Sequence, residues 1–387
     1  MFKKSLAALA VLGVAAGYAS AANVTLYGVA DLGLMYNHSK VETGNTATKT
    51  DSFGLESGIN AGSRFGLKGT EELGNGLTVG FKLENSFNAD DGTLGHDSRL
   101  FGREASVSLS GAFGTLSAGR MGGVGSFAGV DTVFANGDAF DGGDNDVLGL
   151  ALSSRYDNLL QYQTPVFAGV QGTFQYSFKG DNKDATQKDL REGSSAVDRY
   201  YSASLNGNWG AVGAVVAYEY FNYASFGAAA TNPEHEDGQI VYLGGNYDCG
   251  FAKTFAMAQY FKGVKVGAVS ALGFLSDEQA KTANTTYNDG VKGYGLHLGT
   301  QVPVLAGTTT VGLYYVDMTA ESSNAAVEDR DATYYGVAAR YEYPLSKRTT
   351  VYTGAGYGKT KIDQVVDGDV ERSNELVQAY VGLKHTF

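Results

Sequence analysis

The chain has 387 residues and a formal net charge of −12, with 54 Gly, 25 Tyr and 20 Phe but only four Pro, one Trp and one Cys. The acidic balance argues against nucleic-acid binding, which needs basic patches, and the lone Cys249 excludes an intramolecular disulfide. No apolar run of about 18 residues follows the N-terminal segment, so the sequence offers no transmembrane helix.

The first residues are typical of an export signal. Lys3 and Lys4 precede an apolar run over residues 6–16, and the small residues 19–21 follow it. We predict cleavage after Ala21, which gives a signal peptide of residues 1–21 and one continuous domain of residues 22–387. Removing 21 of the 387 residues leaves 366, and the loss of both lysines changes the net charge from −12 to −14.

The mature chain is a series of runs in which apolar and polar residues alternate. In the first run, Val24, Leu26 and Leu34 share one parity, whereas Thr25 and Asp31 share the other. This period of two predicts strands with one apolar and one polar face. Further runs cover residues 77–84, 170–178, 200–206, 212–223, 239–247, 252–261, 294–302, 309–317, 333–343, 349–359 and 376–387, with shorter runs near Arg64, Arg103, Leu116 and Gln161. The total is about sixteen strands.

The connections between these runs differ in length. Those at residues 72–76, 206–210 and 344–347 are short, whereas long polar connections are expected at 41–59, 85–98, 120–154, 180–198, 224–238, 263–290 and 319–330. Short turns at one end and long loops at the other are typical of a transmembrane antiparallel β-barrel in a bacterial outer membrane. The fold class we predict is therefore all-β, with water inside the barrel and hydrocarbon outside.

Five segments resemble the Gram-negative general porins. They are VTLYGVAD (24–31), SRFGLKGTEELG (63–74), FGTLSAGR (113–120), YPLSKRT (343–349) and VGLKHTF (381–387). The resemblance implies a sixteen-stranded barrel, a homotrimer, and a third long loop that folds into the lumen as a constriction. It also implies contact with outer-membrane lipid and lipopolysaccharide, and passive diffusion of small hydrophilic solutes and ions without a cofactor.

The acidic side of this constriction is expected in the connection over residues 120–154. Selectivity in a pore depends on the charges at its narrowest ring. An alternative is that some of these carboxylates only cap turns or solvate the loop. The run 141–146 also resembles a calcium-binding loop but lacks the following Glu, so no metal site is predicted. The candidates are Asp131, Asp138, Asp141, Asp144 and Asp146.

The opposing basic wall is expected on the strands. If Phe65 and Leu67 face lipid, Arg64 and Lys68 point inward, and the same parity turns Lys82 and Glu84 inward. A lipid-facing Arg near the bilayer midplane costs roughly 2–4 kcal/mol, which favours the inward direction. The basic-wall candidates are Arg64, Lys68, Lys82, Arg103, Arg120 and Arg155, with Tyr27, Asp31 and Tyr162 as further lumen candidates.

Arg103 conflicts with the parity pattern. The resemblance places it on the pore wall, yet it shares parity with Val107 and Leu109, which suit lipid. Either a β-bulge intervenes, or the face of Ser106 and Ser108 is the outer one. Arg99 could belong to a loop instead. Gln161 stands where the family usually has a second Arg, so we expect a weakly selective or cation-leaning pore.

The sequence pattern leaves three alternatives to a general diffusion channel. A substrate-specific porin would show an aromatic ladder along the lumen, which a sequence cannot reveal. A plugged adhesin or structural barrel is compatible with the long loops. A barrel enzyme needs a His beside an acid and a nucleophile, but His38, His96 and His235 fall in separate loops and His297 and His385 in strands. The trimer contact is expected on the apolar wall near the first and last strands.

Overall fold

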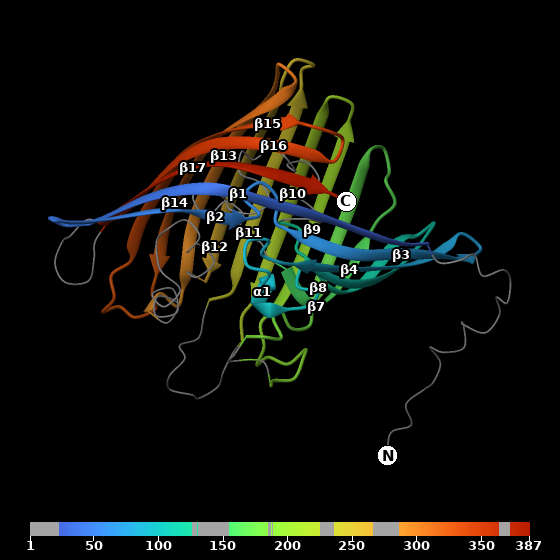
Figure 1. The fold of residues 1–387 in the computed structure, drawn as a ribbon. Coiled ribbons are helices and arrows are strands. Elements are labelled where there is room, and N and C mark those ends of the chain that lie inside the picture. Colours follow the sequence, from blue (N-terminus) through green and yellow to red (C-terminus); the bar gives the residue numbers. More distant parts are fainter. Residues whose placement is uncertain are drawn as a thin grey trace.

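The computed structural model describes residues 23–125, 130, 155–184, 187, 189–224, 236–265, 286–363 and 372–387. Over these residues the chain is a closed antiparallel β-barrel with tilted, curved strands (Figure 1). The one named helical element among the described residues is the single turn α1 (Gly95–Ser98). None of the helical structure described is long and apolar enough to cross a membrane.

The strand elements number seventeen over the described residues, and nearly all run in an up-and-down order. They are β1 (Asn23–Thr43), β2 (Thr46–Ser57), β3 (Arg64–Gly74), β4 (Leu77–Ser86), β5 (Glu104–Gly111), β6 (Gly114–Gly122), β7 (Arg155–Gln163), β8 (Val170–Ser177), β9 (Arg199–Trp209), β10 (Val212–Asn222), β11 (Gly238–Asp248), β12 (Lys253–Val264), β13 (Gly290–Val304), β14 (Gly307–Glu321), β15 (Arg330–Pro344), β16 (Thr349–Ile362) and β17 (Arg372–Thr386).

Seventeen elements make sixteen barrel strands because two of them share one place in the wall. The C-terminal part of β1 pairs with β2, from Leu32↔Ser57 to Thr43↔Thr46. The N-terminal part of β1 pairs with β3, from Asn23↔Thr70 to Val29↔Arg64. β2 and β3 are thus two halves of one strand position, interrupted at residues 58–63. The predicted number of about sixteen strands is confirmed.

The barrel closes where its first and last strands meet. β1 pairs with β17 from Val29↔Thr386 to Thr43↔Arg372. Beyond the ladder, Gly28 and Phe387 exchange two backbone hydrogen bonds of 3.0 Å. A Cβ on Gly28 would lie 2.3 Å from the Phe387 ring and 2.6 Å from the backbone carbonyl oxygen of Arg64, so a glycine is required here.

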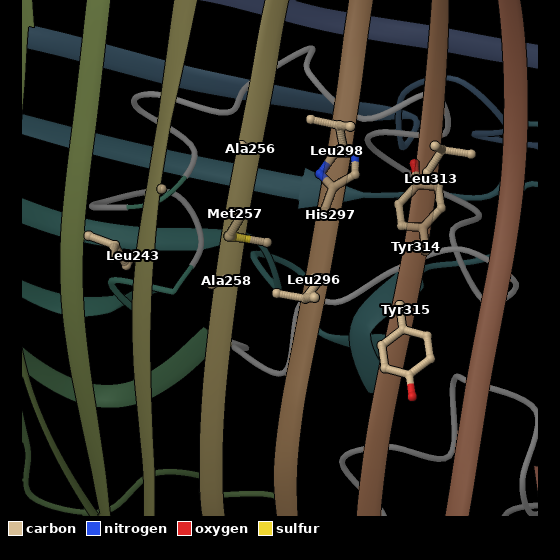
Figure 2. Close-up of a pocket in the computed structure, with 11 residues that line it drawn as sticks. Leu243, Ala256, Met257, Ala258, Leu296, His297, Leu298, Leu313, Tyr314 and Tyr315 are labelled. Carbon is tan, nitrogen blue, oxygen red and sulfur yellow. The ribbon is translucent and has the colours of Figure 1, made fainter.

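The side chains alternate across the wall as the period of two predicts. On β13, Leu296 and Leu298 are 47% and 51% exposed and face outward, whereas His297 between them is 5% exposed. His297 stacks on Tyr314 of β14 with ring centroids 4.7 Å apart. Figure 2 shows these side chains and Leu313 on neighbouring strands. They line an apolar hollow of about 550 Å³ in the wall. An apolar outer face and a mixed inner face suit a barrel with lipid outside.

One predicted connection is wrong. Residues 41–59 were expected to form a long polar loop, but β1 runs to Thr43 and β2 begins at Thr46, so most of this stretch is a hairpin. In Figure 1 the hairpin of β1 and β2 projects beyond the neighbouring strands. Polar residues misled the prediction because a strand outside the bilayer needs no apolar face, and alternation is then lost.

The interruption between β2 and β3 packs against the inner wall. The Ala61 N–H donates to Asp31 Oδ2 (3.0 Å), and the Tyr352 hydroxyl donates to Asp31 Oδ1. Ile59 and Asp31 are fully buried at this seam. A buried carboxylate of this kind holds the interrupted segment to β1 and β16 through directed hydrogen bonds.

Candidate functional site

The charged wall is built on the inner faces of β1, β3 and β4. Tyr27 pairs with Gly66, and Gly66 pairs in turn with Glu84, while Lys68 pairs with Lys82. Residues directly opposite in an antiparallel pair share a face. Tyr27, Lys68, Lys82 and Glu84 therefore lie on one face, with Arg64 two positions from Gly66 on the same side.

Glu84 is the centre of the first group of charges on this wall. Its carboxylate accepts hydrogen bonds from the Tyr27 hydroxyl (2.8 Å) and from Arg103 Nε (2.7 Å). Lys82 Nζ lies 3.7 Å from the same carboxylate and 2.7 Å from Glu104 Oε2. Only 8% of Glu84 is exposed, so its charge is balanced mainly by these cations rather than by water.

A bulge at the start of β5 turns Arg103 inward. Glu84 pairs with Glu104, yet the Arg103 N–H also donates to the Glu84 carbonyl (3.2 Å). Two residues therefore stand opposite one, which is the arrangement of a β-bulge. Ser106 pairs with Lys82 on the inner face, whereas Val107 is 58% exposed on the outer face. Of the two alternatives for Arg103, the structure has the bulge.

A second irregularity positions Arg120. The pairing of β6 with β7 shifts register between Gly119 and Met121. Gly119 has a φ of 138°, and a Cβ there would lie 2.0 Å from the Ala105 carbonyl oxygen, so only glycine fits. If the pairing stayed regular, the Arg120 side chain would face outward like that of Ala105, its partner on β5. Instead its Nη1 reaches Asp157 Oδ1 (2.6 Å), and its Nε donates to the Gly102 carbonyl (2.7 Å).

Asp157 is the centre of the second group of charges. Besides Arg120, it binds Arg99 Nη1 through both oxygens (2.9 and 2.8 Å) and accepts the Asn182 N–H (2.8 Å). Arg99 also pairs with Asp181. The sequence leaves a loop position open for Arg99 and does not identify Asp157. Arg99 does lie in a connection, next to α1, and it joins the wall through this buried carboxylate.

His96 lies near the guanidinium groups of Arg103, Arg120 and Arg155. His96 belongs to α1 in the connection between β4 and β5. Burial, together with the positive charges of Arg155, Arg103 and Arg120, lowers the pKa of His96 to about 4. His96 is therefore neutral at neutral pH. The effect of three arginines on one imidazole indicates how closely cationic groups gather at this end of the wall.

Gln161 and Tyr162 lie on opposite faces of β7. Gln161 is buried on the inner face and accepts a 2.7 Å hydrogen bond from Gln175 Nε2. Ser202 donates in turn to Gln175 Oε1 (2.9 Å). Tyr162 pairs with the exposed Phe174 and donates to the Phe113 carbonyl (2.7 Å), so it lies on the outer face near a short turn. Tyr162 is therefore not a lumen residue.

The segment that leaves β6 turns against the inner wall. The Gly125 N–H donates to Glu219 Oε1 (3.2 Å), and the Val124 N–H donates to the Tyr200 hydroxyl (3.2 Å). Glu219 is fully buried and also accepts hydrogen bonds from the hydroxyls of Tyr200 (2.5 Å) and Tyr242 (2.8 Å). We call Val124 and Gly125, with Val130 packed beside them, the loop stem.

The sequence had not identified Glu219 as an anchor of this loop stem. The sequence does contain a signal for it, because an acidic residue within a strand of a barrel has to avoid lipid and find partners. The acidic-loop candidates Asp131, Asp138, Asp141, Asp144 and Asp146 lie outside the described residues. Among the residues that are described, no group of three or more His, Cys, Asp or Glu is placed to hold a metal ion.

The site thus consists of two carboxylates, Glu84 and Asp157, each surrounded by cations on the inner wall, beside a loop stem fixed to that wall. Such a wall can orient and filter ions by charge as they pass. Its groups are engaged mainly in ion pairs with one another, which keeps long side chains in fixed positions.

Comparison with known proteins identifies relatives of this barrel. A family model described as Gram-negative porin matches residues 7–363. An outer membrane porin protein of Bordetella pertussis is 31% identical over 92% of this chain and 94% of its own length. The solved structure of an anion-selective porin from Comamonas acidovorans is 25% identical, covers 95% of this chain and 100% of its own, and has a TM-score of 0.64.

A trimer form of OmpT, an outer membrane protein of Vibrio cholerae, shows the same fold at 15% identity, with a TM-score of 0.56 over 95% of this chain and 99% of its own. The chain belongs to the Gram-negative porin family. It is a multi-pass β-barrel of the bacterial outer membrane and forms a diffusion channel.

Proposed function

We propose that the channel carries small hydrophilic solutes and ions by passive diffusion, with no catalysed reaction, through a constriction between the charged wall and the acidic loop. The observation that carries this proposal is the loop stem, which leaves β6 and is fixed to the buried Glu219 on the inner wall. A stem fixed to the inner wall supports a loop that enters the lumen. The basic wall would be Arg64, Lys68, Lys82, Arg103, Arg120 and Arg155, and the acidic side Asp131, Asp138, Asp141, Asp144 and Asp146.

We infer that the ion selectivity of this constriction is weak. The six basic-wall residues are accompanied by three carboxylates, Glu84, Glu104 and Asp157, which leaves an excess of three positive charges to face the five loop aspartates. Gln161 adds none where the family usually has a second Arg. The relative from Comamonas acidovorans is named as anion-selective. Near balance in this chain supports a weaker preference, neutral or towards cations.

The test is the reversal potential of the purified protein in a planar bilayer under a KCl gradient. One unit charge at about 7 Å in water attracts one ion by roughly 0.6 kcal/mol and repels the ion of opposite sign by as much, which gives a factor of about seven in the preference between cation and anion. We expect a cation-to-anion permeability ratio between about one and seven. Firm anion preference would contradict the charge balance, and a barrel without ionic steps would contradict a channel.

We further propose that the chain is a homotrimer whose contact lies near the seam of the barrel. Supporting this are four large apolar side chains exposed on the outer face of β1 and β2, namely Leu34, Tyr36, Phe53 and Leu55, of which Phe53 is 71% exposed. OmpT of Vibrio cholerae is recorded in a trimer form. The remaining outer face would contact lipid and lipopolysaccharide, and residues 1–21 would be removed on export.

The trimer contact is tested by Phe53→Asp, with Leu243→Asp on β11 as a matched control, since Leu243 is also exposed on the outer face. A charge in a subunit contact prevents association, whereas one on the lipid face lowers the stability of the barrel without selecting the oligomer. Cross-linking in mild detergent should give monomers only for the first variant. Trimers in both would exclude this contact.

A further inference from the structure

A row of polar side chains crosses five neighbouring strands on the inner wall, beside the loop stem. Ser117 of β6 pairs with Gln161 of β7, which pairs in turn with Gln175 of β8. Gln175 pairs with Ser202 of β9, and Ser202 pairs with Glu219 of β10. All five side chains are buried. Residues directly opposite in neighbouring strands share a face and a level of the wall, so we call these five the polar row.

The chain that leaves β6 follows this row across the strands. The carbonyl of Gly122, the last residue of β6, accepts a hydrogen bond from Gln175 Nε2 on β8 (2.9 Å). The loop stem comes next, bound to Tyr200 on β9 and to Glu219 on β10. Three residue steps of extended chain cover about 10 Å, and two strand spacings measure about 9.5 Å. From Gly122 to Gly125 the chain therefore runs along the wall rather than straight towards the pore axis.

Gln175 lies at the centre of this arrangement and uses both ends of its amide. Its Nε2 also donates to Gln161 Oε1 (2.7 Å), and its Oε1 accepts from the Ser202 hydroxyl (2.9 Å). The Gly122 carbonyl can only accept, which fixes the orientation of the amide. Because Gln175 is only 5% exposed, water has little access to replace a lost donor at this point.

We propose that Gln175 is a positioning residue of the channel, which holds the start of the loop flat against the wall and so keeps the lumen wide. Gln175 acts through the Gly122 carbonyl and does not itself have to touch a solute. The wall lies on one side of this segment, so a segment released from Gln175 can move only towards the pore axis, where it narrows the water path. This inference rests on the proposed function and names a residue that sets the width of its constriction.

The experiment is single-channel recording on the intact protein with two variants of Gln175. Gln175→Leu removes the donor without adding a charge. A buried acceptor without its donor is costly, so the segment should leave the wall at least about fivefold more often. We expect a lower mean open conductance, frequent brief decreases in current and an unchanged reversal potential. Polyethylene glycols of graded size, added to test which polymers enter the pore, should give a smaller exclusion size.

Gln175→Glu provides a second test, because a carboxylate still accepts from Ser202 but has no N–H to donate to Gly122. It should show the same frequent decreases in current, together with a shift of the reversal potential towards cation preference. The two variants thus separate the lost hydrogen bond from the added charge.

Gln171→Leu and Gln171→Glu are the matched controls. Gln171 lies on the same strand and the same face, and its Nε2 also donates to a backbone carbonyl, that of Thr164 (3.1 Å). That carbonyl belongs to the short connection between β7 and β8, away from the loop stem. Both controls should keep the wild-type exclusion size and the wild-type frequency of current decreases. Circular dichroism and heat-modified gel mobility check that every barrel is folded.

Four outcomes would count against these proposals. A folded Gln175→Leu barrel with wild-type conductance and exclusion size would overturn the role of Gln175, as would a higher conductance in that variant. Equal changes in Gln171→Leu would show a general effect of losing a buried amide and would also overturn it. A wild-type protein without ionic steps would instead overturn the proposed function, so the two failures are distinguishable.

Discussion

Glu219 should control how firmly the stem of the proposed constriction loop is held. Its buried carboxylate accepts three hydrogen bonds, from Tyr200, Tyr242 and the Gly125 N–H of the loop stem. Glu219→Ala leaves that backbone N–H without an acceptor, which costs about 1–3 kcal/mol. Because 1.4 kcal/mol corresponds to a factor of ten, the stem should leave the wall about 5 to 150 times more often.

Glu219→Gln provides a graded comparison. Its amide oxygen can still accept from Gly125, and its NH₂ can donate to the Tyr242 hydroxyl, since a hydroxyl also accepts. Only the extra strength of the charged acceptor is lost, so the effect should be clearly smaller than in Glu219→Ala. Glu321→Ala removes a carboxylate that pairs with Lys292 near the end of β14, away from the stem, and serves as the control.

The assay for these variants is single-channel recording, with the frequency of current closures and the open conductance as readouts. Circular dichroism and heat-modified gel mobility confirm that each barrel is folded. We expect frequent closures in Glu219→Ala, few in Glu219→Gln and the wild-type pattern in Glu321→Ala. A folded Glu219→Ala barrel with wild-type conductance and closures would refute the idea that Glu219 holds the stem.

Three further outcomes are expected. Arg155→Gln removes one charge and should raise the cation-to-anion permeability ratio about sevenfold if the charge lies about 7 Å from the ion path, as read from reversal potentials; an unchanged ratio would place Arg155 away from the ion path. Gly119→Ala should lower the free energy of barrel unfolding by about 2 kcal/mol or more, and clearly more than Gly210→Ala, where an added Cβ would meet no heavy atom within 4 Å. Because the pKa of His96 is lowered to about 4, below its usual 6.5, the unfolded chain binds the proton first as pH falls, so stability should decline between pH 6.5 and about 4. His96→Gln should remove that part of the decline, as measured by urea unfolding; an equal decline in the variant would exclude His96 as its source.

The sequence determined the barrel and much of the wall. A period of two over most of the chain specifies strands with two faces. Because lipid lies outside the barrel, turning Lys82, Glu84 and Arg64 outward would cost free energy, so they point inward. Local patterns were sufficient here because the faces of a strand are fixed by its own backbone. The hairpin of β1 and β2 escaped prediction because strands outside the bilayer lack that constraint.

Only the tertiary structure decided which charges meet. Arg103 and Arg120 are turned by a bulge and by a register shift at Gly119, and parity fails at such irregularities because one extra residue reverses every face that follows. The partners Asp157 and Glu219 come from strands far apart in the chain. The joining of Arg99 to Asp157 and of Gly125 to Glu219 depends on how the sheet curves into a closed barrel, and no local run of residues encodes that curvature.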